Sequence, residues 1–246
     1  MNVTYNIPLV ILSAIVAVAA GYFTIEMSRE ITLNKGLERW TWLIISAVTM
    51  GMGIWGMHFI AMTAFSIEPK ITYDFVIVLI SLVAAVAGCL QGLYIITQPL
   101  INKKILIAGS ITMGSAIAGM HYIGMAAMRV SANISYDPLI FALSVLIAIV
   151  VSFAAIIIVI GLRTAKKDQT YTWKTILASL IMGGAVLSMH YTGMAAARFK
   201  INYGMIIEQT NMLDSGVIGF SIALAVLGMF AIVYVVLLNA NWNRST

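Results

Sequence analysis

Hydrophobic residues fill seven long runs of this chain, and short polar segments separate the runs. A membrane-spanning helix needs roughly 20 mostly apolar residues, and each run approaches or exceeds that length. The runs do not alternate between polar and apolar positions as barrel strands do, and lipid admits only helices or closed barrels. We therefore predict an all-α membrane protein whose seven transmembrane helices lie at about Ile7–Ile25, Thr41–Phe65, Tyr73–Ile96, Ile105–Met128, Pro138–Leu162, Lys174–Ala197 and Val217–Asn239.

The composition supports a protein that lies in a lipid bilayer. Of the 246 residues, 61% are hydrophobic and 9% are charged, whereas soluble domains carry about 25% charged residues. The formal net charge is +5, but the basic residues lie in gaps between apolar runs, so we expect no nucleic-acid partner. The single Cys89 excludes an intrachain disulfide. The first apolar run has no basic residue before it, which argues against a cleaved signal peptide.

Basic residues are distributed unequally between the two ends of the predicted helices. One end carries Arg29, Lys35, Arg39, Lys103, Lys104, Arg163, Lys166, Lys167, Lys174 and Arg244, and the other carries Lys70, Arg129, Arg198 and Lys200. An excess of Lys and Arg marks the cytoplasmic side. We therefore predict an outside N-terminus and an inside C-terminus, so that the second, fourth and sixth helices run outward.

Three related stretches carry the only three histidines of the chain. They are Gly56–Ala64, Gly119–Ala127 and Ser188–Ala196. In each stretch one Met precedes the His and a second follows it by four residues, and a third Met, upstream of the stretch, stands eight residues before the His. The histidines are His58, His121 and His190; the three sets of methionines are Met57, Met120 and Met189, then Met62, Met125 and Met194, then Met50, Met113 and Met182.

The three stretches occupy equivalent places in the second, fourth and sixth predicted helices. Each His lies about eight residues before the outer end, or about 12 Å below the outer surface at 1.5 Å per residue. We predict one domain, 1–246, with parallel two-helix repeats at about 7–66, 72–130 and 138–199 and an unpaired seventh helix at about 217–239. In transporters with internal repeats, binding sites lie where the repeats meet.

The chemistry of the repeated residues indicates a metal site. Thioethers select Cu(I), and imidazole suits copper, zinc and iron. Carboxylates are absent at this depth, which excludes magnesium and calcium. Small residues two positions before and three after each His allow close helix contact. We predict copper bound by the three histidines together with Met57, Met62, Met120, Met125, Met189 and Met194, and we interpret the methionines at −8, about 12 Å deeper, mainly as packing residues.

Other interpretations remain open at this point. A single intramembrane His is more often a packing residue, but three at one depth with repeated methionines favour a functional site. Haem is an alternative that three equivalent histidines fit poorly, and a purely structural protein is another. No acidic residue or nucleophile pairs with a His at its depth, so we predict no enzyme. Arg129 and Arg198 are expected to reach lipid headgroups.

Met189-His190-Tyr191-Thr192 spells MHYT, and the stretches starting at Met57 and Met120 are variants of it. Over nearly its whole length the chain resembles the bacterial MHYT domain. The resemblance implies a multi-pass sensory domain of the bacterial cytoplasmic membrane. It also implies that these His and Met residues bind copper near the outer face, and that the signal is oxygen, carbon monoxide, nitric oxide or redox state. The main alternative is copper transport or delivery.

Many members of that family carry a cytoplasmic diguanylate cyclase, phosphodiesterase or DNA-binding domain. This chain ends after its seventh predicted helix. The output is therefore expected to come from a separate cytoplasmic signalling partner, or the chain is a piece of a longer protein.

Overall fold

Seven long helices make up most of the computed structural model, which describes residues 4–68, 70–98, 100–202, 204 and 211–245. Within these residues the helices are α1 (Ile7–Leu33), α2 (Gly36–Ala64), α3 (Phe75–Ile95), α4 (Lys103–Ala126), α5 (Pro138–Leu162), α6 (Gln169–Ala196) and α7 (Ser215–Ser245). Each is long and apolar enough to cross a membrane, so the seven predicted spans are confirmed. Part of the predicted outer connection, 203 and 205–210, and the side chain of Arg244 lie outside the described residues.

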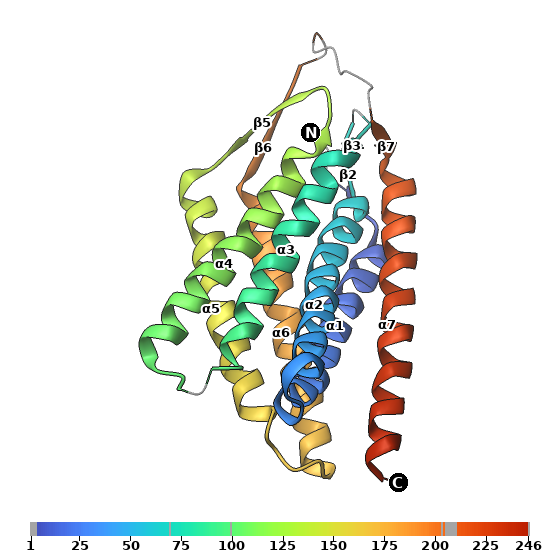
Figure 1. Cartoon of the computed structure of the whole chain (residues 1–246). Helices are drawn as coiled ribbons and strands as arrows, with labels where there is room; N and C mark the ends of the chain where they lie inside the picture. Colours follow the sequence, from blue (N-terminus) through green and yellow to red (C-terminus); the bar gives the residue numbers. More distant parts are fainter. Residues whose placement is uncertain (1–3, 69, 99, 203, 205–210, 246) are drawn as a thin grey trace.

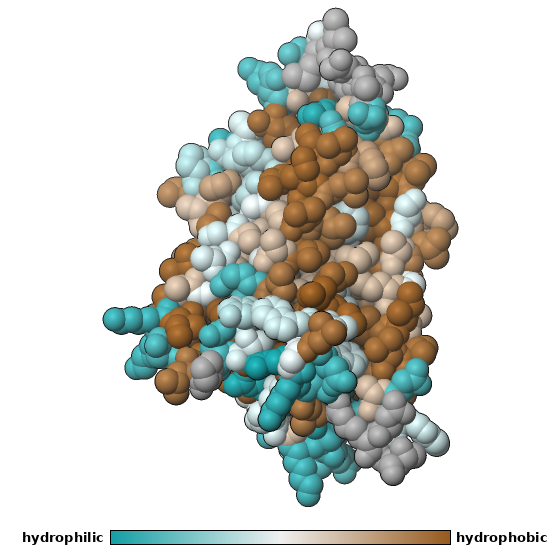
Figure 2. Space-filling model, viewed as in Figure 1, coloured by the Kyte–Doolittle hydropathy of each residue, from teal (hydrophilic) through white to brown (hydrophobic). Residues whose placement is uncertain are grey.

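The surface matches a multi-pass membrane protein. Hydrophobic side chains cover the middle of the face in Figure 2, and hydrophilic ones gather toward the two ends. Large apolar side chains such as Leu139 and Phe220 are 83% and 72% exposed. Such exposure is costly in water but not in lipid. The two chain termini lie at opposite ends of the bundle (Figure 1). The cytoplasmic location of the C-terminus stays a prediction.

Helix α1 continues eight residues beyond the predicted end at Ile25. The hydropathy pattern stops at the first charge, Glu26, but the structure pairs that charge. The Glu26 carboxylate accepts a hydrogen bond from the Tyr171 hydroxyl at 2.8 Å and forms an ion pair with Lys167 at 2.9 Å. A partner reduces the cost of burying a charge, so the helix keeps its regular backbone to Leu33.

The first six helices form a closed ring. Each packs against its neighbour in the sequence, and α1 closes the ring against α6. Helices α2, α4 and α6 also contact one another across the ring, so these three helices surround a common axis. Helix α7 lies outside the ring against α2 and α1.

Short strands at one end of the bundle join the helices in pairs. The strands are β1 (Thr4–Tyr5), β2 (Phe65–Ser66), β3 (Thr72–Asp74), β4 (Met128–Arg129), β5 (Ala132–Tyr136), β6 (Ala197–Ile201) and β7 (Met212–Asp214). The antiparallel pairs β1–β2, β3–β4 and β5–β6 each enclose two helices, and β7 pairs with the other edge of β3. A strand–helix–helix–strand unit therefore occurs three times. Strands of two to five residues are too short for their alternation to show in a sequence.

Acidic side chains fix the start of two odd-numbered helices. Asp74 caps α3 and Asp137 caps α5 by accepting backbone N–H groups. Arg129 pairs with Asp74 at 3.2 Å, and Arg198 pairs with Asp137. We expected the two arginines to reach lipid headgroups, and in the structure each also contacts a carboxylate of the protein. The N–H of Ile140, together with that of Leu139 and with Arg198, holds the pKa of Asp137 below its ordinary value.

Three glycines bring each motif helix close to the next odd-numbered helix. Each stands seven residues before a motif His. A Cβ at any of them would overlap atoms of the neighbouring helix, backbone atoms included. The contacting pairs are Gly51 with Val86, Gly114 with Ile149 and Gly183 with Val18. Small residues at helix contacts are common in membrane proteins because they permit backbones to approach.

Candidate metal centre

The structure brings the three histidines together on the axis of the ring. The Nδ1 atom of His58 lies 3.1 Å from Nδ1 of His190 and 3.2 Å from Nδ1 of His121. The three ring centroids are 4.9 to 5.2 Å apart, and each pair of rings is nearly perpendicular. All three side chains are at most 1% exposed. One nitrogen from each of three helices therefore faces the same point in the core.

Two glycines of the motif make room for these rings. A Cβ at Gly124 of α4 would overlap Nε2 of His58, and a Cβ at Gly193 of α6 would overlap Nε2 of His121. Each of these two histidines thus leans from its own helix onto the next motif helix. The equivalent position in α2 is Ala61. The small residue three positions after each His sets how closely the rings converge.

The spacing of the Nδ1 atoms fits a first-row metal ion. Imidazole nitrogens bind such ions at roughly 2.0 Å, so two ligands of a tetrahedral site stand about 3.3 Å apart. Two of the separations, 3.1 and 3.2 Å, are close to that value, and one ring nitrogen from each of the three histidines lies within 4.8 Å of the other two. Nδ1 of His58 carries either one proton or one lone pair. Without an ion, that one group would have to serve two neighbouring nitrogens. A cation removes that conflict because all three lone pairs can point at it.

The other ring nitrogen sets this centre apart from most histidine metal sites. Among the described residues, Nε2 of His58 and Nε2 of His121 have no hydrogen-bond partner. A metal-binding His usually donates this N–H to a carboxylate or carbonyl, which raises the basicity of the ligand. Here the ring edges meet aromatic residues instead, Phe59 beside His58 and Tyr122 beside His121. The outer ring nitrogens of His58 and His121 are therefore held by packing and not by a hydrogen-bond acceptor among the described residues.

All six predicted methionine ligands lie in the core beside the histidines. The three methionines that precede a His by one residue are at most 1% exposed. The three methionines that follow a His by four residues are at most 6% exposed. The six are Met57, Met120 and Met189, and Met62, Met125 and Met194. On each helix the second Met is one turn beyond its His, on the same face. The six thioethers thus lie in the buried core on the same three helices as the imidazoles, and their role as ligands stays a proposal.

Buried serines on the odd-numbered helices support the residues around the histidines, and the hydropathy pattern does not single them out. Ser144 lies 2.6 Å from the hydroxyl of Tyr122, and Ser81 accepts a hydrogen bond from the indole N–H of Trp55 at 3.0 Å. Together with Ser13, both are fully buried. Each stands seven residues after the cap residue of its helix; the caps are Asn6, Asp74 and Asp137. That cap-to-serine spacing is a repeat signal that the sequence contains.

Three curated bacterial proteins are similar to this chain over most of its length. Signaling protein YkoW of Bacillus subtilis is 38% identical over 81% of the chain, and the matched region is 25% of that protein. The bifunctional diguanylate cyclase/cyclic di-GMP phosphodiesterase MucR of Pseudomonas aeruginosa is 43% identical over 80% of the chain and 29% of its own length. The cyclic di-GMP phosphodiesterase NbdA of the same organism is 39% identical over 87% of the chain and 27% of its own length.

The chain thus spans between 25% and 29% of the length of these relatives. No solved structure matches it. The sequence model of the family described as "Bacterial signalling protein N terminal repeat" matches three times, at 51–109, 114–172 and 183–245. These matches cover most of the chain and each includes one histidine of the cluster. The chain therefore belongs to the MHYT family of membrane sensory domains of bacterial signalling proteins.

Proposed function

We propose that the three-histidine centre binds one copper ion and that the domain senses a diatomic gas or redox state through that ion. The observation that carries this proposal is the convergence of three Nδ1 atoms, from α2, α4 and α6, on one buried point. Three imidazoles leave a fourth position of a tetrahedral ion for a thioether or an exogenous ligand.

The charge of the surroundings favours a monovalent soft ion. No carboxylate belongs to the cluster, so the charge of the bound ion is not compensated by its ligands. Burying an uncompensated charge is costly, and a dication costs more than a monocation. The methionines beside each His add soft donors, which prefer Cu(I). Copper therefore fits these residues better than zinc or iron.

The position of the centre suits a gas or redox signal. Small neutral gases partition into a bilayer and reach a buried site without an aqueous channel. Because the ligands stand on three helices, a change of coordination would shift those helices relative to one another. A ligand shifts a conformational equilibrium only as far as its affinity differs between the two states. We propose that the ring of helices has two arrangements and that copper chemistry shifts the equilibrium between them.

The output of the signal is proposed to lie on the cytoplasmic side. MucR and NbdA carry cyclic di-GMP activities by name, and the similar region is less than a third of each. This helical region is thus proposed to be the non-enzymatic input, and a cytoplasmic signalling domain or partner the output.

A single reconstitution experiment separates sensing from transport, the main alternative. The chain is loaded with copper in lipid vesicles, and a spectroscopic label is placed on an inner connection at Ala165. A sensor keeps its copper, and its absorption spectrum and label respond to oxygen, nitric oxide or carbon monoxide. Sustained movement of copper across the vesicles, with spectra and label unchanged by every gas, would replace sensing by transport.

A further inference from the structure

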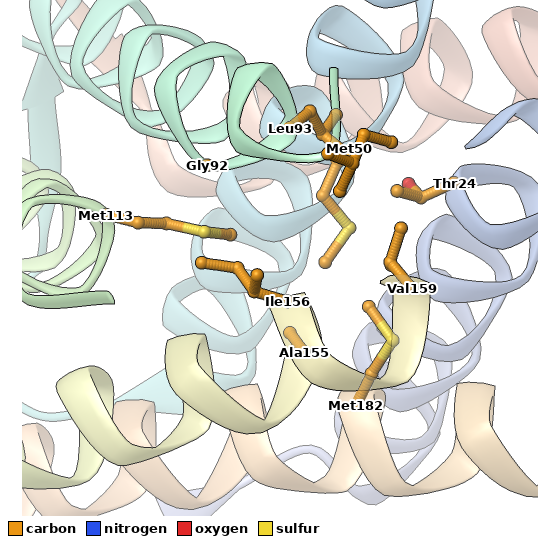
Figure 3. Close-up of a pocket in the computed structure, with 10 residues that line it drawn as sticks. Thr24, Met50, Gly92, Leu93, Met113, Ala155, Ile156, Val159 and Met182 are labelled. Carbon is orange, nitrogen blue, oxygen red and sulfur yellow. The ribbon is translucent and has the colours of Figure 1, made fainter. Parts of the chain in front are cut away.

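A cavity lies on the axis of the ring, deeper than the histidines. It has a volume of about 20 Å³, and residues from all six ring helices line it. Met50 of α2, Met113 of α4 and Met182 of α6 extend toward it from three sides (Figure 3). These are the methionines eight residues before each His, which the sequence led us to interpret as packing residues. Their side chains are buried in the core and line one common cavity.

The lining of this cavity repeats with the threefold pattern of the chain. The three methionines are equivalent positions, each eight residues before its His. Thr24, Gly92 and Ala155 are equivalent as well, because each stands 18 residues after the cap of its helix. A Cβ at Gly92 would overlap the sulfur of Met113, so the glycine provides the space that this sulfur occupies. The cavity is thus a feature of the repeat and not a local packing defect.

An apolar layer separates this cavity from the histidines. Each motif helix carries a β-branched residue four positions before its His, one turn deeper. These residues, Ile54, Ile117 and Val186, are at most 3% exposed. The eight-residue offset between Met and His corresponds to about 12 Å along a helix. One ion cannot contact both sets of donors, so the two clusters would be separate sites.

The chemistry of the lining selects the occupant. A cavity of this size holds about one water-sized guest, and a buried water needs two to four polar partners. Thr24 is the hydroxyl residue of the lining, and its hydrogen is already donated to the carbonyl of Ala20 at 2.7 Å. Carboxylate and imidazole groups are absent from the lining residues, which excludes hard cations. Thioethers are neutral soft donors that select Cu(I).

We propose that Met50, Met113 and Met182 form a second metal site, a thioether-only site for a soft monovalent ion, Cu(I). The chain would then hold two soft ions in line on its axis, one at the histidines and one about eight residues deeper. This inference does not depend on the sensing proposal, because it follows from the cavity and its three sulfurs. It holds for a sensor and for a transporter alike.

The test counts metal ions bound by the full chain in lipid nanodiscs. Under reducing, oxygen-free conditions the protein is titrated with Cu(I) and, separately, with Ag(I), which does not change redox state. The wild type should bind two equivalents. Exchanging Met50, Met113 and Met182 together for Leu keeps the side-chain volume similar and should remove one equivalent. Met27→Leu, a buried methionine of α1 packed against α7, should keep both.

X-ray absorption identifies the ligands of each ion. The remaining ion of the triple Met variant should show nitrogen ligands. In a variant with all three histidines exchanged for Ala, an ion surrounded by sulfur alone should remain. A wild type that binds the sulfur-surrounded ion but no ion at the histidines would count against the sensing proposal alone. Two equivalents in a folded triple Met variant would overturn the second site. Xenon occupying the cavity while Ag(I) binds only at the histidines would also overturn it, and would make the cavity a gas pocket.

Discussion

Nδ1 of His58 lies 3.1 Å from Nδ1 of His190, although 132 positions separate the two residues in the chain. The same atom of His58 lies 3.2 Å from Nδ1 of His121. A neutral imidazole offers one proton or one lone pair at that atom, so it cannot satisfy both neighbours in the ring plane. A shared cation satisfies all three nitrogens, and this relationship is the basis of the predictions on metal binding.

Exchanging any one of the three histidines for Ala should weaken copper binding at the histidine centre by at least about 100-fold. Loss of a residue that only orients a ligand already costs 10- to 100-fold, and here a ligand itself is lost. Competition with a Cu(I) chelator measures the affinity, and circular dichroism reports whether the helices remain. Unchanged affinity in a folded His58→Ala variant would show that copper does not use this cluster.

Gly124→Ala should weaken copper binding without removing a ligand. The added Cβ would overlap Nε2 of His58 and push the ring away from its partners. We expect a loss of affinity of about tenfold or more, as for other changes that misplace a ligand. Gly119→Ala on the same helix is the matched control because no atom of another helix lies within 4 Å of its added Cβ. Equal affinities in the two variants would mean that ring position does not control the site.

Leu in place of Met62, Met125 or Met194 should weaken Cu(I) binding more than Cu(II) binding. The thioether is a soft donor that Cu(I) prefers, whereas imidazole binds both oxidation states. The exchange conserves volume, so the fold should persist. The measurement is the redox potential of the bound copper, which should fall in the variants. A potential equal to that of Met27→Leu would show that these sulfurs do not contact the ion.

Asp137→Ala should lower the Tm more than Asp137→Asn. Asn keeps the helix cap and loses the ion pair with Arg198, whereas Ala loses both. The folded-state pKa of Asp137 is lowered, so its stabilisation is present above the ordinary pKa of about 3.9 and is lost as pH falls through the folded value. Thermal unfolding at pH 7 and at about pH 3 should therefore show the difference between wild type and Asp137→Asn shrinking in acid. A difference that grows in acid would contradict this assignment.

Cysteine labelling should place Asn102 and Ala165 in the cytoplasm and Lys70 outside. Asn102 and Ala165 lie at the end of the bundle that carries the excess of basic residues, and such an excess marks the cytoplasmic side. The native Cys89 is fully buried, so it should not react with a membrane-impermeant reagent in intact cells. Labelling of Asn102→Cys from outside would invert the orientation and move the histidines toward the inner face.

The seven spans and the common depth of the histidines follow from the sequence by itself. Both depend on distances along one helix, which the length of a hydrophobic run and the rise per residue determine. The recurrence of His and Met at fixed spacing also indicates the donor set. These properties are local, so no knowledge of contacts between distant residues is needed to predict them.

The tertiary structure decided which atoms face one another. The choice of Nδ1 over Nε2 depends on the packing of His58 against Gly124 of another helix. The common cavity of Met50, Met113 and Met182 depends on how α2, α4 and α6 are rotated about the axis. Both features join residues more than 60 positions apart, and a helical pattern records the face of one helix but not its partner. Only packing of the closed ring sets those partners, because each contact depends on the positions of all six helices.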